Sequence, residues 1–298
     1  MTALVIGEAL IDVVSAPGRP ERRTPGGGPF NVAIGLARLQ IPTALLAHVG
    51  TDADGQLLLD ALEDAGATFV GERVGVTSTA HAHLAEDGSA TYRFALDWDP
   101  HLAGEISTDR LWGAVHVGSL GAFLRPGREL VDRLLEHEPA RLRSFDPNIR
   151  PGLVGPPDEA RSRVEAIAGR IDVLKLSDED AAWLYPGVDI ADVIAMLLAS
   201  GPSLIAVTRG GDGSVIATHE HTVEIAAPRT QVVDTIGAGD AYMSAMLGAL
   251  ILNDAVAVGI ENLSADMLLD MGGIASRAAA FVVARAGSNP PTFEQLRG

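Results

Sequence analysis

The chain has 298 residues, 47% of them hydrophobic, and a formal net charge of −17 at pH 7. This length suffices for one large α/β unit, and the negative charge argues against nucleic acid or an anionic membrane as a partner, because both require clustered positive charge. There is no cysteine, which excludes disulfides and thiolate metal sites and suits a cytoplasmic location. With neither a leader nor a membrane-length apolar run, we expect a soluble protein that acts on a small molecule.

Short apolar segments rich in Val, Ile and Leu alternate with amphipathic segments along the chain. The apolar segments predict strands at 3–7, 43–50, 114–119, 143–148, 173–177 and 204–210. Apolar residues at helical spacing predict helices at 30–39, 55–65, 128–138, 158–168 and 190–200. The alternation predicts a three-layer α/β/α fold with a mostly parallel central sheet, whose ligands collect at the carboxyl ends of the strands.

The first glycine cluster, GGGPFNVAIGLARL at 26–39, opens a predicted helix with Asn31 in its first turn. Glycine permits close approach of the backbone to a ligand, and the Asn31 amide offers both a donor and an acceptor. These properties suit sugar hydroxyls, and a flexible loop followed by an Asn cap explains them equally well.

Residues 79–96 alternate with a period of two on either side of Asp87-Gly88, a dipeptide suited to a tight hairpin turn. Together with the extended stretch after Gly7, this hairpin predicts a small β layer that projects from the main sheet; an ordinary edge hairpin is the alternative. The even spacing of Tyr92, Phe94 and Trp98 predicts an exposed aromatic face, which either closes over a ligand or packs on a second subunit.

Two stretches in the second half carry weaker signals. FDPNIRP at 145–151 places Asp146, Asn148 and Arg150 at a strand end, and VTRGGDGSV at 207–215 forms a glycine-rich turn suited to a nucleotide. Plain turns explain both patterns as well. Lys175 is the only lysine, and no glycines precede it, so a P-loop is excluded.

The stretch VVDTIGAGDAYMSAML at 232–247 carries the strongest signal. Val232-Val233-Asp234 predicts a strand end and Tyr242–Leu252 a helix, which places Gly237-Ala238-Gly239 at the junction. Unpaired N–H groups and the helix dipole form an anion site there. Asp240 stands beside it, suited to take the proton of an attacking hydroxyl, so the motif indicates phosphoryl transfer. A dinucleotide fingerprint fits less well, because the third glycine is missing.

Taken together, these motifs resemble the PfkB family of carbohydrate kinases, which has the ribokinase-like fold, over nearly the whole chain. DTIGAGDAYMSAML is the specific part, and GGGPFNVA lies at the right distance upstream. The resemblance implies a single kinase domain over 1–298, with a β lid formed from about 8–23 and 75–100 that closes over the sugar and pairs two subunits in a homodimer. GEALIDVV, GGGPFN and DPNIRP look most like the fructokinase branch, so fructose is the first substrate expected.

The resemblance also implies roles for individual residues. Asp240 matches the catalytic base, and Gly237, Ala238 and Gly239 match its anion hole. The residues matched to the sugar site are Asp12, Gly27, Gly28, Asn31, Arg150 and Asp240. Those matched to the ATP site are Ser177, Thr208, Gly210, Gly213 and Gly239. The implied metals are Mg²⁺, held through water by Asp180, and a monovalent cation such as K⁺ at Asp234 and the Ile236 carbonyl.

The chain departs from the family at one motif. Members usually carry Asn-x-x-Glu near the phosphates and Mg²⁺, whereas Ser177 and Asp180 stand there in this chain. A shorter carboxylate still holds metal-bound waters, because Mg²⁺ keeps several of them.

The sequence therefore predicts an ATP- and Mg²⁺-dependent kinase that transfers the γ-phosphoryl to a primary hydroxyl of a small sugar. Alternative substrates are 2-keto-3-deoxygluconate, ribose and nucleosides. A sugar-sensing binding protein is the non-enzymatic alternative, and the intact Asp240 argues against it, because a sensor needs no base. A dehydrogenase is disfavoured by the missing fingerprint.

Overall fold

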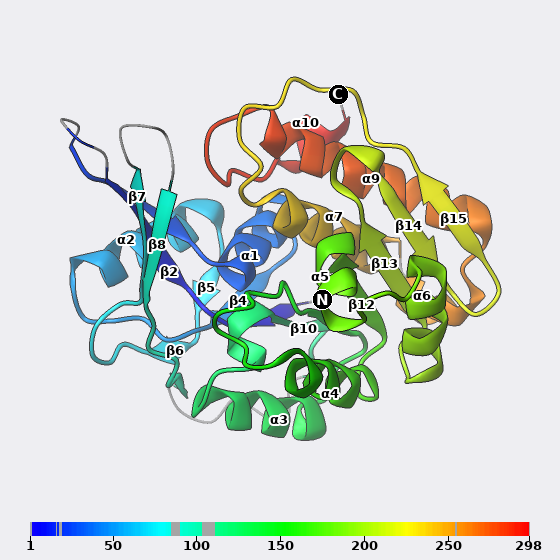
Figure 1. Ribbon diagram of the computed structural model, residues 1–298, viewed down its shortest axis with the longest axis horizontal. Helices are drawn as coiled ribbons and strands as arrows, with labels where there is room; N and C mark the ends of the chain where they lie inside the picture. Colours follow the sequence, from blue (N-terminus) through cyan, green and yellow to red (C-terminus); the bar gives the residue numbers. More distant parts are fainter. Residues whose placement is uncertain are drawn as a thin grey trace.

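The computed structural model describes residues 2–15, 17, 20–84, 90–102, 111–253 and 255–297. Within these ranges, a nine-stranded sheet lies between two layers of helices (Figure 1). Across the sheet the strands are β15 (Thr222–Ile225), β14 (Ser214–Ala217), β13 (Leu204–Thr208), β12 (Val173–Ser177), β11 (Arg143–Asp146), β10 (Ala114–Gly118), β1 (Ala3–Ile6), β4 (Thr43–Leu46) and β5 (Thr68–Phe69). The strands from β13 to β5 pair in parallel, whereas β14 and β15 add antiparallel at one edge.

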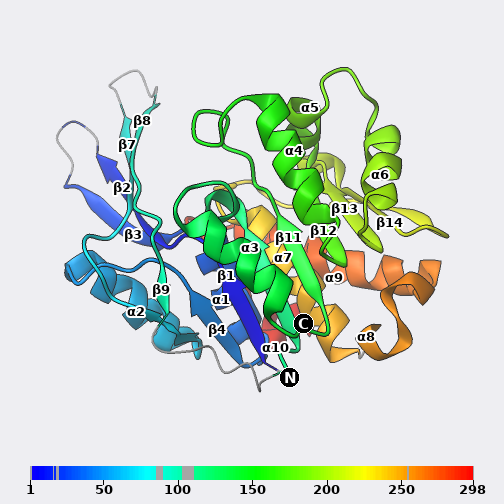
Figure 2. The ribbon, with the colours of Figure 1, turned by 90° about the horizontal axis from the view of Figure 1, so that it is seen from below.

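Helices cover both faces of this sheet (Figure 2). One face carries α1 (Gly28–Arg38), α7 (Ala238–Leu252) and α9 (Ala265–Val283), and α7 packs against the other two. The opposite face carries α3 (Gly127–His137), α4 (Pro157–Ala168), α5 (Asp178–Leu184) and α6 (Ile190–Ala199). The remaining helices are α2 (Ala53–Ala65), α8 (Ala255–Val258) and α10 (Phe293–Arg297), with short 3₁₀ turns at η1 (Ser119–Ala122), η2 (Gly210–Asp212) and η3 (Ile260–Asn262).

The chemistry of the strands explains their place in the sheet. Strands β1, β4 and β10 are buried along their whole length, as expected for parallel strands with helices on both faces, whose sequences are continuous apolar runs.

Helix α2 shows how the sequence sets helix ends: the Asp52 side chain accepts a hydrogen bond from the Gly55 N–H at 2.8 Å, and Gly66 ends the helix at φ 83°. The predicted α/β fold is thus confirmed. No helix in the described ranges is long and apolar enough to cross a bilayer.

The segment before α7 differs from the prediction. Residues 232–234 do not form a strand end; the N–H groups of Val233 and Asp234 donate to the Val283 carbonyl at 2.9 and 3.2 Å. The end of α9 therefore satisfies these backbone groups without a neighbouring strand. The prediction rested on the apolar pair Val232-Val233, yet these side chains are 65% and 57% exposed. Helix α7 starts from a loop, with Gly237 in the left-handed region at φ 77°.

A second sheet projects from the first, as predicted (Figure 1). Its strands are, in order, β3 (Arg22–Gly26), β2 (Leu10–Ser15), β7 (Thr79–Leu84) and β8 (Ala90–Ala95). Strands β7 and β8 form the predicted antiparallel hairpin, and its Asp87-Gly88 turn lies outside the described residues. The short strands β6 (Gly71–Glu72) and β9 (His101–Leu102) pair separately.

Trp98 corrects part of the predicted aromatic face. Trp98 is 4% exposed and belongs to the main core; β8 ends at Ala95, so the alternation of the strand does not extend to it. The fit is close: a Cβ on Gly127 would lie 2.2 Å from the Trp98 indole nitrogen. Phe94 is 41% exposed, and the side chain of Tyr92 lies outside the described residues.

Candidate active site

Polar residues gather where the parallel strands of the main sheet end. Gly118 pairs with Asp146 across β10 and β11, and Ser177 pairs with Thr208 across β12 and β13. In this kind of sheet the carboxyl edge is where ligands bind. The strand ends thus bring together residues that lie far apart in the sequence.

Asp240 lies in the first turn of α7 and is 8% exposed. The Asn31 side-chain amide, from the first turn of α1, donates a hydrogen bond to Asp240 Oδ2 at 2.8 Å. Burial raises the pKa of Asp240 to about 6, and the Asn31 hydrogen bond opposes the rise. The Asp146 charge adds to it, whereas the Lys175 and Arg150 charges lower it. Asp240 is therefore ionised at neutral pH and still basic enough to accept a proton.

Two glycines shape the space beside Asp240. Gly27 precedes α1 at φ 107°, and a Cβ there would lie 2.6 Å from the Glu8 carbonyl oxygen. A Cβ on Gly28 would lie 3.0 Å from Asn148 Nδ2 and 3.4 Å from Asp240 Oδ1. Position 27 therefore needs glycine, and at Gly28 the backbone lies close to the Asp240 carboxylate with no side chain between them.

Asp12 and Arg150 bring charge from two other elements. Asp12 lies half-buried in β2, where burial raises its pKa to about 6 and the positive charge of Arg150 opposes the rise. Exposed Arg150 donates through Nη1 to Asn148 Oδ1 at 2.8 Å. Because Arg150 also lowers the pKa of Asp240, its charge acts on both carboxylates. The structure thus places the residues matched to a sugar site around one region.

The residues matched to a nucleotide site lie further along the same edge. Ser177 and Thr208 are paired ends of neighbouring strands, and the turn after Thr208 contains Gly210 and Gly213, at φ 51° and 89°. A Cβ on Gly213 would lie 1.9 Å from the Ile225 carbonyl oxygen, so this glycine serves packing. Nothing lies within 4 Å of a Cβ on Gly210, which leaves space beside that backbone.

Ser177 and Asp180 form a capping box at the start of α5. The Asp180 N–H donates to Ser177 Oγ at 3.0 Å, and the Ser177 N–H donates to Asp180 Oδ2 at 3.0 Å. The other Asp180 oxygen accepts from the Ile149 N–H at 2.8 Å. Asp180 thereby ties the loop after β11 to the start of α5.

Asp234 binds two parts of the backbone before α7. Its Oδ1 accepts from the Ile236 N–H at 3.0 Å, and its Oδ2 accepts from the Gly287 N–H at 2.8 Å. The loop that presents Ile236 is therefore fastened to the chain after α9. Within the described ranges, no group of three His, Asp or Glu residues is arranged to hold a metal ion.

Sequence reasoning gave no role to two buried charged groups. Lys175 Nζ donates to Asp146 Oδ2 at 2.8 Å, and both side chains are 5% exposed. Glu8 accepts from the Gly121 N–H at 3.1 Å, and burial raises its pKa to about 7, against hydrogen bonds from its surroundings. The signal for both was present, since a charged residue within or directly after a buried strand requires a partner.

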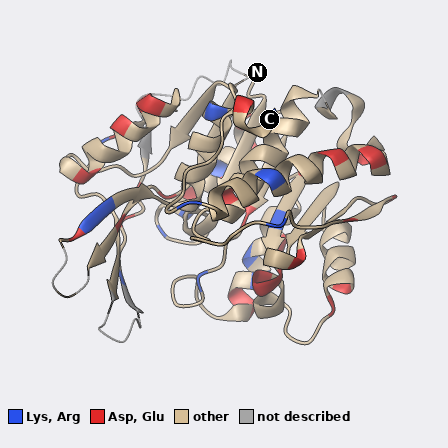
Figure 3. Ribbon diagram, turned by 90° about the horizontal axis from the view of Figure 1, so that it is seen from above, with Lys and Arg blue, Asp and Glu red and all other residues tan. Residues whose placement is uncertain are grey.

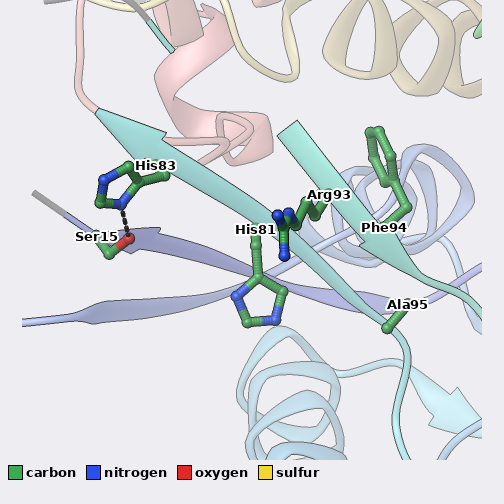
Figure 4. Close-up of a pocket in the computed structure, with 6 residues that line it drawn as sticks. All are labelled: Ser15, His81, His83, Arg93, Phe94 and Ala95. Carbon is green, nitrogen blue, oxygen red and sulfur yellow. Dashed lines mark hydrogen bonds between the residues drawn. The ribbon is translucent and has the colours of Figure 1, made fainter. Parts of the chain in front are cut away.

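A cavity of about 640 Å³ opens beside the second sheet, lined by Ser15, His81, His83, Arg93, Phe94 and Ala95 (Figure 4). Side chains directly opposite one another in a sheet share a face. By register His81 shares a face with Arg93, whereas Phe94 lies opposite Ala80 and shares the face of Asp12. Exposed Phe94 thus lies on the same side of the sheet as a residue of the proposed sugar site.

The fold and the site define an α/β phosphotransferase, in which a helix start and a buried carboxylate meet at the carboxyl edge of the sheet. Residues 2–295 match the family described as pfkB family carbohydrate kinase. The chain belongs to this family and is a carbohydrate kinase, as its motifs predicted.

Relatives agree with this assignment, and solved structures agree with the fold. A fructokinase of Rhizobium leguminosarum bv. trifolii is 33% identical over 83% of this chain and 79% of its own. A fructokinase of Xylella fastidiosa with bound ATP has a TM-score of 0.85 at 24% identity, covering 99% of this chain and 97% of its own. A fructokinase of Vibrio cholerae O395 with fructose, ADP and calcium ion has a TM-score of 0.79 at 25% identity, covering 99% of this chain and 95% of its own.

Proposed function

We propose that this protein is an ATP-dependent fructokinase that transfers the γ-phosphoryl of ATP to a primary hydroxyl of fructose, with Asp240 as the base. One contact carries the proposal: the Asn31 side-chain amide donates to Asp240 Oδ2 at 2.8 Å, close to the backbone of Gly28. A helix start that binds anions adjoins this carboxylate. Fructose as the substrate is supported by the names of the relatives, which are fructokinases.

The geometry supports a direct transfer. Asp240 takes the proton of the sugar hydroxyl as its oxygen bonds to the γ-phosphorus, while the bond from that phosphorus to the β–γ bridging oxygen breaks and ADP leaves. The N–H groups of Gly237 and Gly239 stabilise the charge on the transferring group in this proposal. The Ala238 N–H donates to the Thr235 carbonyl at 3.3 Å and would have to leave it to join them. Asp12 and Arg150 hold sugar hydroxyls in this proposal. The protein supplies positioning and charge, which is most of what phosphoryl transfer requires.

ATP is assigned to the edge formed by Ser177, Thr208, Gly210 and Gly213. Mg²⁺ would neutralise phosphate charge there, and Asp180 would hold it through water. The contacts of Asp180 fit this indirect role, because its two oxygens already accept backbone N–H groups and keep lone pairs for water. K⁺ at Asp234 and the Ile236 carbonyl remains part of the proposal.

The second sheet is proposed to act as a lid, formed from about 8–23 and 75–100 of a single kinase domain. Its support is the shared face of Asp12 and exposed Phe94. The same face would pair two subunits in a homodimer, and the enzyme is proposed to work in the cytoplasm.

Positively charged positions are scattered over the described elements rather than gathered on one of them (Figure 3), which fits a small anionic ligand better than a polyanion.

A screen of ADP release over sugars and nucleosides tests the proposal. We expect fructose to give the highest kcat/KM among fructose, ribose, 2-keto-3-deoxygluconate and nucleosides. A preference for ribose or a nucleoside would reject fructose and keep the kinase assignment. Sugar binding without ADP release would favour the sugar-sensing protein instead.

A further inference from the structure

The only lysine of the chain is buried under the proposed site. Lys175 is the third residue of β12, and its side chain ends in an ion pair with Asp146 at the end of β11. Both side chains are 5% exposed. An ion pair so deeply buried costs desolvation energy that its own attraction does not clearly repay, so stability alone is a weak reason for it.

The backbone of α7 makes room for this ammonium group. A Cβ on Gly239 would lie 3.0 Å from Lys175 Nζ, which is tighter than nearly all real contacts of that kind. Gly239 directly precedes Asp240, so the positive charge lies against the helical turn that carries the proposed base. The glycine before Asp240 thus has a second purpose besides the anion hole.

The charges around Asp240 come from several elements. Apart from the neutral Asn31 amide, these are Glu8 after β1, Asp146 at the end of β11, Arg150 in the loop after β11 and Lys175 in β12. Lys175 in turn faces Asp146, Asp180 and Asp240, and His116 in β10. Burial lowers the pKa of Lys175, but attraction from the carboxylates outweighs it and keeps the amine protonated. Burial, with the Lys175 charge, lowers the pKa of His116 to about 3, so this ring stays neutral.

We propose that the buried Lys175–Asp146 pair is a positioning device for phosphoryl transfer: Lys175, fixed by Asp146 beneath Gly239, keeps Asp240 in its ionised form. This inference rests on the proposed role of Asp240 as the base. Asp146 serves two purposes in it. It holds the ammonium in place, and its own negative charge limits how far Lys175 stabilises the Asp240 carboxylate.

The proposal predicts opposite effects for the two partners. Lys175→Met removes the cation and should move the acid limb of kcat/KM upward from pH 6 by about one unit. At pH 6 the ionised fraction of Asp240 then falls about five-fold, whereas at pH 8 it barely changes. Asp146→Asn removes the opposing carboxylate and should move the limb to lower pH. The double variant has no buried unpaired charge, and its acid limb should lie at nearly the same pH as that of the unmodified protein.

Arg163→Met is the matched control, because Arg163 pairs with Asp132 at 2.8 Å between α4 and α3, outside this set of charges. It should lower stability and leave the acid limb in place. Circular dichroism confirms folding for each variant, and if one single variant unfolds, the sign of the Asp240 shift in the other single variant still tests the proposal.

The pH profiles are paired with carboxylate ¹³C NMR of protein labelled at aspartate, in which Asp240→Asn identifies the Asp240 signal. The NMR titration measures the protonation of Asp240 even if the protein does not turn over fructose. The proposed function and the role of the Lys175–Asp146 pair can therefore fail separately. Shifts of opposite sign for Lys175→Met and Asp146→Asn are expected. Shifts of the same sign, or an Asp240 titration unchanged in each folded single variant of the pair, would overturn the role of the pair.

Discussion

The start of α7 and the second sheet contribute to the same proposed site in opposite ways. Around Asp240 the side chains are buried, hydrogen-bonded and surrounded by fixed charges. In the second sheet Asp12 is half-buried and Phe94 is 41% exposed. A dry, packed setting fixes pKa values and geometry, whereas a thin sheet with an open face is free to close on a ligand. We therefore propose chemistry for the first region and substrate capture for the second.

The largest expected effect follows from removing the base. Asp240→Asn should lower kcat by about 10²–10⁴-fold with little change in sugar affinity, because Asn31 can still contact an amide and only proton transfer is lost. Steady-state kinetics and calorimetric sugar binding measure the two quantities. If the variant keeps nearly the unmodified kcat, Asp240 is not the catalytic base.

The second prediction concerns sugar affinity. Asn31→Ala and Asp12→Ala should each raise the sugar KM by about 5- to 150-fold, because each leaves a polar partner unsatisfied at a cost of about 1–3 kcal/mol. The KM for ATP should change much less. Equal changes in both constants, or none, would assign these side chains to structure and weaken the contrast between the regions.

The third prediction uses the pKa of Asp240, about 6. The base works when ionised, so kcat/KM should be level above pH 7 and fall at least about tenfold per unit well below pH 6. A profile measured with Asp240→Asn is the control and should keep only the part of this limb that Asp12, with a pKa also near 6, contributes. A limb near pH 4 would contradict the effect of burial.

The same shift has an opposite consequence for stability. A carboxyl whose folded pKa is raised contributes stability that is present below its unfolded pKa, near 4, and lost as the pH rises through about 6. Asp240→Asn should therefore raise the unfolding free energy at pH 8 by about 1–3 kcal/mol, and the melting temperature with it, and change both little at pH 4. Thermal unfolding at the two pH values measures this. Destabilisation at pH 8 would show that burial of the carboxylate is not costly.

The smallest effect is expected in the second sheet. Phe94→Ser should weaken self-association, raise the sugar KM a few-fold, or increase ATP hydrolysis without sugar, because each follows from a less complete closure. Met196→Ser is the matched control, an exposed apolar residue on α6 that is 49% exposed. An unmodified protein that sediments as a monomer, with a fully active Phe94→Ser variant, would leave the sheet without a role as a lid.

Local patterns predicted most of the fold but little of the electrostatics of the site. Apolar strands such as 173–177 have local signatures and were placed correctly; the glycines before Asp240 do lie at a helix start, but no strand precedes them and the helix begins at Ala238. Trp98 was misplaced because period-two spacing ends where β8 ends, which the sequence does not mark. The approach of Lys175 to Gly239 depends on how β12 and α7 pack, so no local spacing could indicate it.

The most direct test is the ³¹P NMR spectrum of the purified protein with ATP, Mg²⁺ and fructose. The proposed function predicts ADP and a phosphate ester in equal amounts, the ester signal split by two methylene protons, as a primary hydroxyl requires. The same mixture with Asp240→Asn should stay almost unchanged over that time. Release of inorganic phosphate without an ester, or no consumption of ATP with any sugar, would contradict the assignment of this site.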